Sequence, residues 1–280
     1  MKSSVDKTHE DLLTQAASGN PNSLRLLSRK DDVIIDNWKN YPENFSNNMV
    51  EYQKWFDECD SLKSCVAKGE IDFHNRILTP DIYKILGDPR EKIALDIGFG
   101  GGRLVLASSK VFKNVIGIDV LSEKLRKMTE KFLDSQGTNN YELLDPDSML
   151  KIESNSVDFV YSYIVFQHFS SIDYFHKYMD LIRRVLKPGG VGNIFFGLCV
   201  AKNPGIHQVV KEDGFYHWHE GFKTGNRRST LCYDPSWVHD QIENHHGMKI
   251  AAVVRFTKQP WSNSENLSSQ FCVKFVNKGT

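Results

Sequence analysis

The sequence lacks the charge features by which many binding proteins are assigned to a partner. It carries no net charge, with 35 lysines and arginines against 35 aspartates and glutamates among 280 residues, and no run of five like charges occurs. Proteins that bind duplex nucleic acid or an anionic membrane surface usually present an excess of basic residues. We therefore expect neither nucleic acid nor a membrane among the partners.

Cysteines and long apolar runs are also scarce. The chain has five cysteines, an odd number with no C-x-x-C pair, so we expect reduced thiols instead of a disulfide framework. The most apolar window, residues 194–201, is too short to span a bilayer, and the N-terminus lacks the basic start and apolar run of a secretory leader. These absences predict a cytoplasmic protein.

The histidine spacings that usually bind zinc are absent as well. No H-x-x-x-H or H-E-x-x-H pattern occurs among the ten histidines, so we expect no metal. His217 and His219 would point to one side of an extended segment, where they could contact a ligand together with His207. Further along, His245 and His246 are predicted to lie at the end of a helix, where a partly charged histidine suits the helix dipole.

The chain does carry a glycine-rich turn after an apolar run. Residues 93–103 read IALDIGFGGGR, which predicts a strand buried on both faces that ends in a sharp turn. Glycines let the backbone of such a turn approach a ligand where a Cβ atom would obstruct it. The dinucleotide pattern G-x-G-x-x-G fails, because its third glycine would fall on Arg103 or on Val105.

An acidic residue stands just before this turn. Asp96 lies two residues before Gly98, near the end of the predicted strand. A buried carboxylate is costly without a cationic partner or several hydrogen-bond donors. It would repel a pyrophosphate and attract an ammonium group, so the motif favours an amino-acid-like ligand.

The motif D-I-G-F-G-G-G resembles the first motif of the class I S-adenosylmethionine-dependent methyltransferases, where an acid precedes G-x-G-x-G beneath the methionine part of the cofactor. The strand 114–119 ends in Asp119, near the 20-residue spacing at which an acid holds a ribose in nucleotide-binding folds. The segment YSYIVFQHF resembles the fourth motif of the family, and L-K-P-G-G resembles the turn before its fifth strand. The resemblance covers about two thirds of the chain.

The resemblance implies an α/β fold with a Rossmann-like sheet of seven strands, mostly parallel with an antiparallel last strand. Residues 1–90 lack strand alternation and are predicted to form a helical cap or lid, with one helix over about 48–68 that ends at Gly69. Residues 91–280 would form the methyltransferase domain, with an insertion at 197–232 that shapes the acceptor pocket. The seven strands are expected at 93–97, 114–119, 141–144, 158–162, 191–196, 249–256 and 270–276.

The same resemblance implies S-adenosyl-L-methionine as cofactor and S-adenosyl-L-homocysteine as product. Asp119 would hold the ribose hydroxyls through a bidentate contact. Asp145 is favoured as the acid that accepts from the adenine amino group, and Asp147 competes for this role. The residues expected at the cofactor are Asp96, Gly98, Phe99, Gly100, Gly102, Arg103, Asp119, Val120, Asp145, Ser148, Met149, Tyr161 and Tyr163.

Methyl transfer from a sulfonium is an in-line displacement, so the protein must mainly align the reacting atoms and exclude water. A hydroxyl acceptor also needs a base, and histidine is matched to that task at neutral pH. We expect His168 as that base and Gln167 as a residue that orients the acceptor; alternatively His168 only hydrogen-bonds the backbone at a strand end. Residues expected to contact the acceptor are Tyr41, His207, His217 and His219.

The leading hypothesis is therefore a methyltransferase that acts on an oxygen or nitrogen of a small molecule, such as a sugar or another biosynthetic intermediate. A second hypothesis is a Rossmann-like regulatory protein that binds the cofactor without turnover. A nicotinamide-dependent oxidoreductase ranks third, because the third glycine of its pattern is missing. The sequence indicates no oligomeric state.

Overall fold

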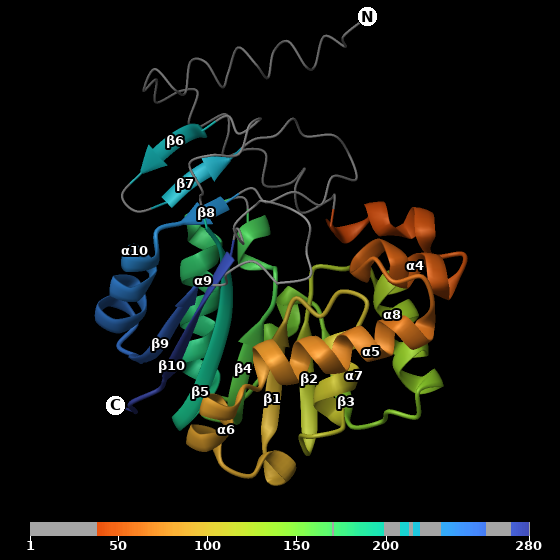
Figure 1. The fold of residues 1–280 in the computed structure, drawn as a ribbon, viewed down its shortest axis with the longest axis horizontal. Coiled ribbons are helices and arrows are strands. Elements are labelled where there is room, and N and C mark those ends of the chain that lie inside the picture. Colours follow the sequence, from red (N-terminus) through yellow and green to blue (C-terminus); the bar gives the residue numbers. More distant parts are fainter. Residues whose placement is uncertain are drawn as a thin grey trace, which may run out of the picture.

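A central sheet of seven strands organises the structure (Figure 1). The computed structural model describes residues 38–169, 171–198, 208–212, 215–218, 231–255 and 270–279. The strand order is β3-β2-β1-β4-β5-β10-β9. The strands are β1 (Ile93–Ile97), β2 (Asn114–Ile118), β3 (Tyr141–Leu144), β4 (Val157–Ser162), β5 (Leu186–Gly197), β9 (Lys249–Arg255) and β10 (Gln270–Val276).

The pairing of the strands confirms the predicted Rossmann-like fold. The neighbours from β3 to β5 pair in parallel, whereas β10 is antiparallel to both β5 and β9. Strand β5 begins at Leu186, so the L-K-P-G-G stretch that was predicted as a turn belongs to the strand itself. Its pairing with β4 shifts register in this stretch, which explains why the sequence reads as a turn.

Helices cover the sheet and bury two hydrophobic clusters. The helices are α4 (Met49–Asp57), α5 (Leu62–Asp72), α6 (Pro80–Leu86), α7 (Arg103–Ser109), α8 (Glu123–Ser135), α9 (Ile172–Val185) and α10 (Pro235–Asp240). One cluster joins the sheet to α9 and α10 through residues such as Phe175 and Val238. The other joins the sheet to α7, α8 and the N-terminal helices through residues such as Leu104, Phe132 and Tyr52. No helix in the described part of the chain is both long and apolar enough to cross a membrane.

Short turns and a second, smaller sheet complete the described structure. The predicted insertion contributes β6 and β7 to an antiparallel sheet with β8, in the order β6-β7-β8. These strands are β6 (Gln208–Glu212), β7 (Phe215–Trp218) and β8 (Leu231–Tyr233). The short helical turns are η1 (Tyr41–Phe45), η2 (Phe73–Ile77), η3 (Pro89–Glu91), η4 (Pro146–Lys151), η5 (Phe166–His168) and η6 (Gln241–His245).

The single helix predicted over about 48–68 is wrong, because the structure has two helices there. Helix α4 ends where Glu58 adopts a left-handed conformation with φ of 55°. Helix α5 then starts at a capping box, in which Ser61 and Ser64 each accept from the other's backbone N–H. Gly69 does not end this helix: it lies inside α5, and a Cβ atom there would be 2.6 Å from the backbone oxygen of Arg103.

The close approach at Gly69 predicts the effect of Gly69→Ala. Alanine would gain about 1 kcal/mol from helix propensity, but overpacking of this kind costs about 1–3 kcal/mol, so we expect net destabilisation in urea unfolding. The control is Lys63→Ala at an exposed position of α5, which should change the free energy of unfolding by less than about 0.5 kcal/mol. A Gly69→Ala protein that is more stable than the unchanged protein would show that the contact between Gly69 and the Arg103 backbone does not restrict this position.

Candidate functional site

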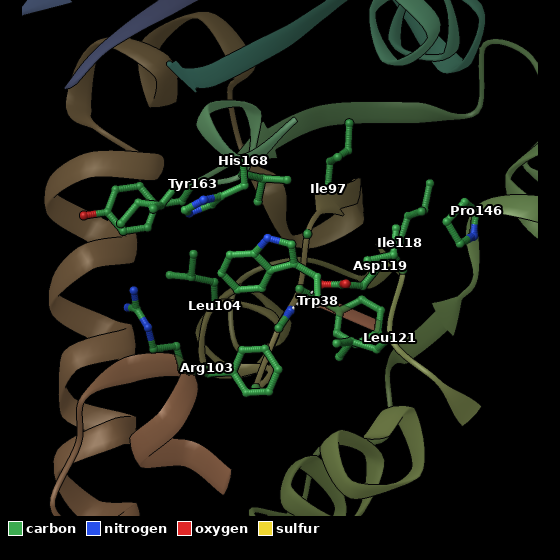
Figure 2. Close-up of a pocket in the computed structure, with 18 of the residues that line it drawn as sticks. Trp38, Ile97, Arg103, Leu104, Ile118, Asp119, Leu121, Pro146, Tyr163 and His168 are labelled. Carbon is green, nitrogen blue, oxygen red and sulfur yellow. Dashed lines mark hydrogen bonds between the residues drawn. The ribbon is translucent and has the colours of Figure 1, made fainter. Parts of the chain in front are cut away.

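A cleft of about 770 Å³ opens at the carboxyl ends of β1, β2, β3 and β4 (Figure 2). In α/β sheets ligands bind outside the carboxyl ends of the strands, where the strand order reverses. Chain order reverses between β1 and β4, so the cleft lies at that point. Of the residues expected at the cofactor, those that line the cleft are Gly98, Phe99, Gly100, Arg103, Asp119, Val120, Asp145 and Tyr163.

The glycine turn has the backbone geometry that its sequence predicts. Gly98 has a φ of 87°, and a Cβ atom there would lie 2.1 Å from a methyl group of Val165. Gly98 therefore lets the segment after β4 pack directly against the end of β1. Gly102, with a φ of 88°, is the N-cap residue of α7 and does not line the cleft.

Asp119 is held at the edge of the cleft by the glycine turn. Its Oδ2 atom accepts a hydrogen bond of 2.8 Å from the backbone N–H of Gly100. Burial raises the pKa of Asp119 to about 6, although the N–H groups of Gly100, Leu121 and Val120 act in the opposite direction. The carboxylate is thus in place to accept from a ligand, and it becomes neutral in mildly acidic solution.

The structure does not bring Asp96 into the wall of the cleft. Its side chain is 1% exposed, and neither oxygen has a hydrogen-bond partner among the residues that the structure describes. Burial, together with the nearby charge of Asp119, raises the pKa of Asp96 well above its usual value, although the Tyr161 hydroxyl and the charge of Arg103 act in the opposite direction. It faces Tyr161 on β4, whose hydroxyl lies 2.9 Å from Ser108 Oγ in the core.

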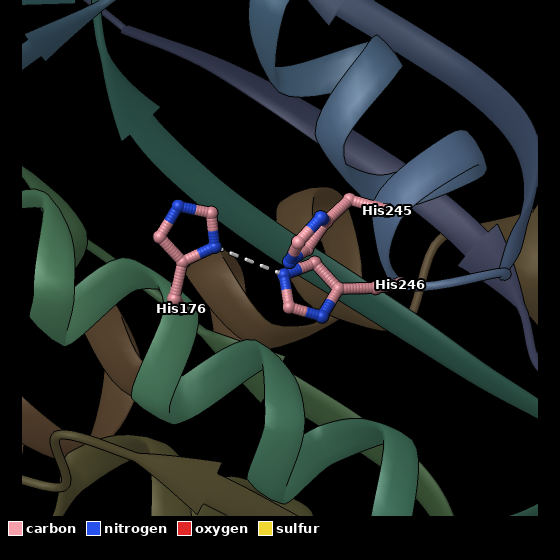
Figure 3. Close-up of side chains that lie close together, drawn as sticks. All are labelled: His176, His245 and His246. Carbon is pink, nitrogen blue, oxygen red and sulfur yellow. Dashed lines mark hydrogen bonds between the residues drawn. The ribbon is translucent and has the colours of Figure 1, made fainter.

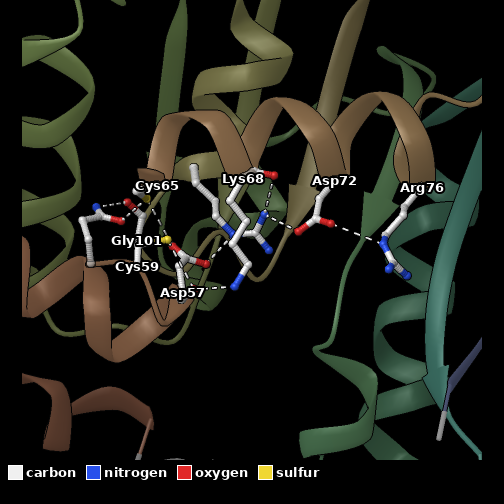
Figure 4. A network of polar contacts seen from close by, with 9 residues as sticks. Asp57, Cys59, Cys65, Lys68, Asp72, Arg76 and Gly101 are labelled. Carbon is white, nitrogen blue, oxygen red and sulfur yellow. Dashed lines mark hydrogen bonds and ion pairs between the residues drawn. The ribbon is translucent and has the colours of Figure 1, made fainter. Parts of the chain in front are cut away.

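A buried polar network joins the N-terminal helices to the glycine turn (Figure 4). The guanidinium of Arg103 forms ion pairs with Asp57 from α4 and with Asp72 from α5, the latter at 2.8 Å. Burial lowers the pKa of Arg103, but the two carboxylates raise it well above its usual value. The amide of Gln53 donates a 2.6 Å hydrogen bond to the carbonyl oxygen of Gly101. Arg103 therefore lines the cleft while its charge is engaged by the helices above it.

The N-terminal helices also supply cleft residues that the sequence did not point to. They are Lys68, Asp72 and Arg76, with Arg76 Nε 3.3 Å from Asp72 Oδ1. These residues belong to α5 and η2, which precede the glycine motif in the chain. No spacing within that motif could therefore have identified them. Asp72 and Arg76 do stand four residues apart on a helical pattern, which predicts an ion pair but not its place beside a cleft.

The segment after β4 brings His168 to the cleft but not Gln167. The ring of His168 lies against that of Trp38, with the ring centroids 4.6 Å apart, and both residues line the cleft. Gln167 is buried outside the cleft lining; its Nε2 lies 3.4 Å from His168 Nε2, and its Oε1 accepts from Gln270. Ile164 has a φ of 62°, which is strained for a β-branched residue and occurs at the cleft itself.

The acids after β3 both reach the cleft. Asp145 accepts a 2.8 Å hydrogen bond from the backbone N–H of Ser148 and lies 3.3 Å from Arg126, and the Ser148 N–H lowers the pKa of Asp145. Asp147 also lines the cleft, so the choice between the two stays a prediction. Ser148 and Met149 are buried outside the lining.

The residues expected at the acceptor fall largely outside what the structure describes. His207 and His219 lie outside the described residues. His217 is described only as backbone in β7, where it pairs with Leu231 of β8. Tyr41 is described only as backbone in η1. The proposed acceptor contacts therefore stay predictions.

Comparison with known families and structures bears on the domain that contains the cleft. Residues 95–193 match a family model described as a methyltransferase domain, a span from β1 to β5 that contains the glycine turn, Asp119 and His168. The comparison with curated proteins found no match.

Solved structures show the same fold at low sequence identity. An S-adenosylmethionine-dependent methyltransferase from Clostridium acetobutylicum is 18% identical, with 76% of this chain and 92% of that chain covered and a TM-score of 0.51. A SAM-dependent methyltransferase from Methanosarcina mazei is also 18% identical, with 71% of this chain and 97% of that chain covered and a TM-score of 0.52. A protein from Pyrococcus horikoshii is 17% identical, with 80% of this chain and 94% of that chain covered and a TM-score of 0.53.

The network around Arg103 predicts a large effect of Asp57→Ala on stability. The substitution leaves a buried guanidinium with one of its two carboxylates, so we expect a loss of about 3 kcal/mol in chemical unfolding. The matched control is Glu91→Ala, which removes an exposed ion pair with Lys113 and should change stability by less than about 1 kcal/mol. Equal effects of the two substitutions would contradict the network's role in holding the helices to the turn.

Proposed function

We propose that this chain, a class I S-adenosylmethionine-dependent methyltransferase by its domain at residues 95–193, transfers the donor's methyl group to an oxygen or nitrogen of a small-molecule acceptor. The single observation that carries the proposal is the cleft, which joins the glycine turn and Asp119 to His168 within about 770 Å³. Ligand pockets for small molecules are of this size, so the cleft suits a cofactor and a small acceptor better than a macromolecule.

The residues of the cleft fit the nucleoside part of the cofactor. Gly98 and Gly100 line the cleft with bare backbone, and a Cβ atom at either would meet Val165 or Phe56. Asp119 lines the cleft beside them, and its carboxylate would accept from the ribose hydroxyls. Asp145 and Asp147 line the same end of the cleft and could accept from an adenine amino group.

The opposite end of the cleft fits the amino-acid part of the cofactor. Figure 2 shows Arg103 and Tyr163 at the side away from Asp119 and Pro146. Lys68, Asp72 and Arg76 also line the cleft, so both signs of charge are available for an ammonium and a carboxylate. We assign the zwitterion to these side chains of α5 and η2, because the carboxylate of Asp96 is buried outside the cleft lining.

The segment after β4 is where the acceptor would meet the donor methyl group. The cofactor supplies a methyl group on a sulfonium, and the protein has to hold the acceptor atom in line with it. His168 is in place to take the proton of an acceptor hydroxyl, and Gln167 acts as a positioning residue because its amide lies against the imidazole. Aromatic residues line the cleft and would help to exclude water once the ligands are bound: Trp38, Phe169, Tyr174 and Tyr178.

The raised pKa of Asp119 predicts a pH dependence of cofactor binding. With its pKa at about 6, the carboxyl becomes protonated as the pH falls through this value and can then accept less well from ribose hydroxyls. The affinity for S-adenosylhomocysteine, measured by calorimetry, should fall by up to about tenfold per pH unit below pH 6. Asp119→Asn should bind roughly 10- to 100-fold more weakly at pH 7.5 and should lack this pH dependence.

Asp147→Asn provides the control for the pH dependence. It changes another acid of the same cleft and should leave the fall in affinity below pH 6 in place. If Asp119→Asn keeps both the affinity and the pH dependence of the unchanged protein, Asp119 does not hold the ribose.

Incubation with S-adenosylmethionine labelled in its methyl group and with cell extract tests the proposed acceptor class. Label should appear in the small-molecule fraction, and label found only in protein or nucleic acid would overturn the proposal. His168→Ala should lower this transfer by at least about 100-fold while binding of S-adenosylhomocysteine changes little. The control is His74→Ala, an exposed histidine that pairs with Glu70 on the helical cap and should leave transfer unchanged.

A further inference from the structure

We propose that His176, His245 and His246 form a binding site for a divalent transition-metal ion of the zinc class. Each of the three offers one ring nitrogen, and these atoms all lie within 4.8 Å of one another (Figure 3). Figure 3 shows the three imidazoles converging, one from α9 and two from the end of η6. Imidazole nitrogen is a good ligand for zinc, copper and nickel.

The spacing of two of the nitrogens already suits a bound ion. Tetrahedral zinc has bonds of about 2.0–2.1 Å to histidine nitrogen, which places neighbouring ligand atoms about 3.3–3.4 Å apart. His176 Nδ1 and His246 Nε2 are 3.3 Å apart. The exposed ring of His245 is free to turn towards them, and a water molecule would complete the four ligands.

The backbone brings two consecutive histidines to one place. The chain ends η6 with a π-type turn, in which the N–H of His246 donates to the carbonyl oxygen of Gln241 at 2.9 Å. Such turns widen the helix and recur at functional sites. Both rings then lie near His176, with centroids 5.2 Å from it for His245 and 5.5 Å for His246.

Asp180 orients one of the proposed ligands. His246 Nδ1 lies 3.2 Å from Asp180 Oδ1, and the His246 side chain is 1% exposed. When Nδ1 carries the proton and donates it to this carboxylate, the lone pair of Nε2 faces the other two histidines. A carboxylate that holds the far nitrogen of a histidine ligand is a recurrent part of metal sites.

Hydrogen bonding alone explains only part of this arrangement. It accounts for the contacts among His176, His246 and Asp180, but not for the approach of the exposed His245 to His176, where the ring centroids lie 5.2 Å apart. A shared ion would explain all three positions. Its open side, at His245, gives access from solvent.

The ion would tie α9 to the turn after α10. Tyr174, Lys177 and Tyr178 of α9 line the cofactor cleft, so the proposed site lies on the helix that forms one wall of the cleft. We therefore expect the ion to stabilise the fold without taking part in the reaction.

Zinc titration of the untagged full-length protein, stripped with a chelator, tests the proposal. Competition with a chromogenic chelator should show one Zn²⁺ per chain, and Zn²⁺ should raise the thermal unfolding midpoint. His176→Ala and His245→Ala should each weaken binding at least about tenfold, and Asp180→Asn should weaken it about 10- to 100-fold. Asp180 and His245 are exposed, so the Asp180→Asn and His245→Ala proteins should fold normally.

His239→Ala is the matched control, because His239 is an exposed histidine of α10 that pairs with Glu243. It should keep the affinity of the unchanged protein. Absence of zinc binding at micromolar concentrations would overturn the proposal. Binding that survives both His176→Ala and His245→Ala would also overturn it, because the ion would then sit elsewhere on the chain.

Discussion

The ion pairs of Arg103 are the interaction on which the rest of the site depends. A buried guanidinium is stable only when its charge is matched, and here Asp57 and Asp72 come from two different helices to match it. Because Arg103 is the first residue of α7, these contacts fix both helices against the glycine turn. Because the chain breaks between α4 and α5 at Glu58, Asp57 and Asp72 belong to two separate helices and both reach Arg103. The cleft is therefore built jointly by the sheet and by the helices that precede it.

Burial gives the two acids at the strand ends different properties. Asp119 keeps a backbone donor and stays beside the cleft, so it can ionise near neutral pH. Asp96 is almost fully buried, and burial together with the charge of Asp119 raises its pKa much further. Two nearby carboxylates that cannot both ionise easily divide their roles in this way. The charged side chains that we propose for the amino-acid end of the cofactor therefore come from the N-terminal helices, where Lys68 and Arg76 line the cleft.

Much of the sheet could be predicted from the sequence, because local pattern decides it. Apolar runs marked β1, β2 and β4, and the family resemblance placed them in order, as the structure confirms. The error over residues 48–68 had a local cause: the apolar spacing continues across Glu58, whereas the left-handed turn there leaves no mark in that spacing. Gly69 was misread for a related reason. Glycine ends many helices, but in α5 it makes room for the backbone of Arg103, a contact between distant parts of the chain.

The sequence by itself determined the glycine turn and the acid after β2, because each lies within a few residues of the strand that positions it. It also indicated a methyltransferase, since these short motifs carry the resemblance. Only the tertiary structure decided that Asp96 is buried outside the cleft lining, that the amide of Gln167 lies beside His168, and that α4 and α5 are joined to the glycine turn through Arg103. It alone brought His176 together with His245 and His246. The physical reason is the same in each case: these contacts join residues far apart in the chain, and packing of whole elements sets their distance.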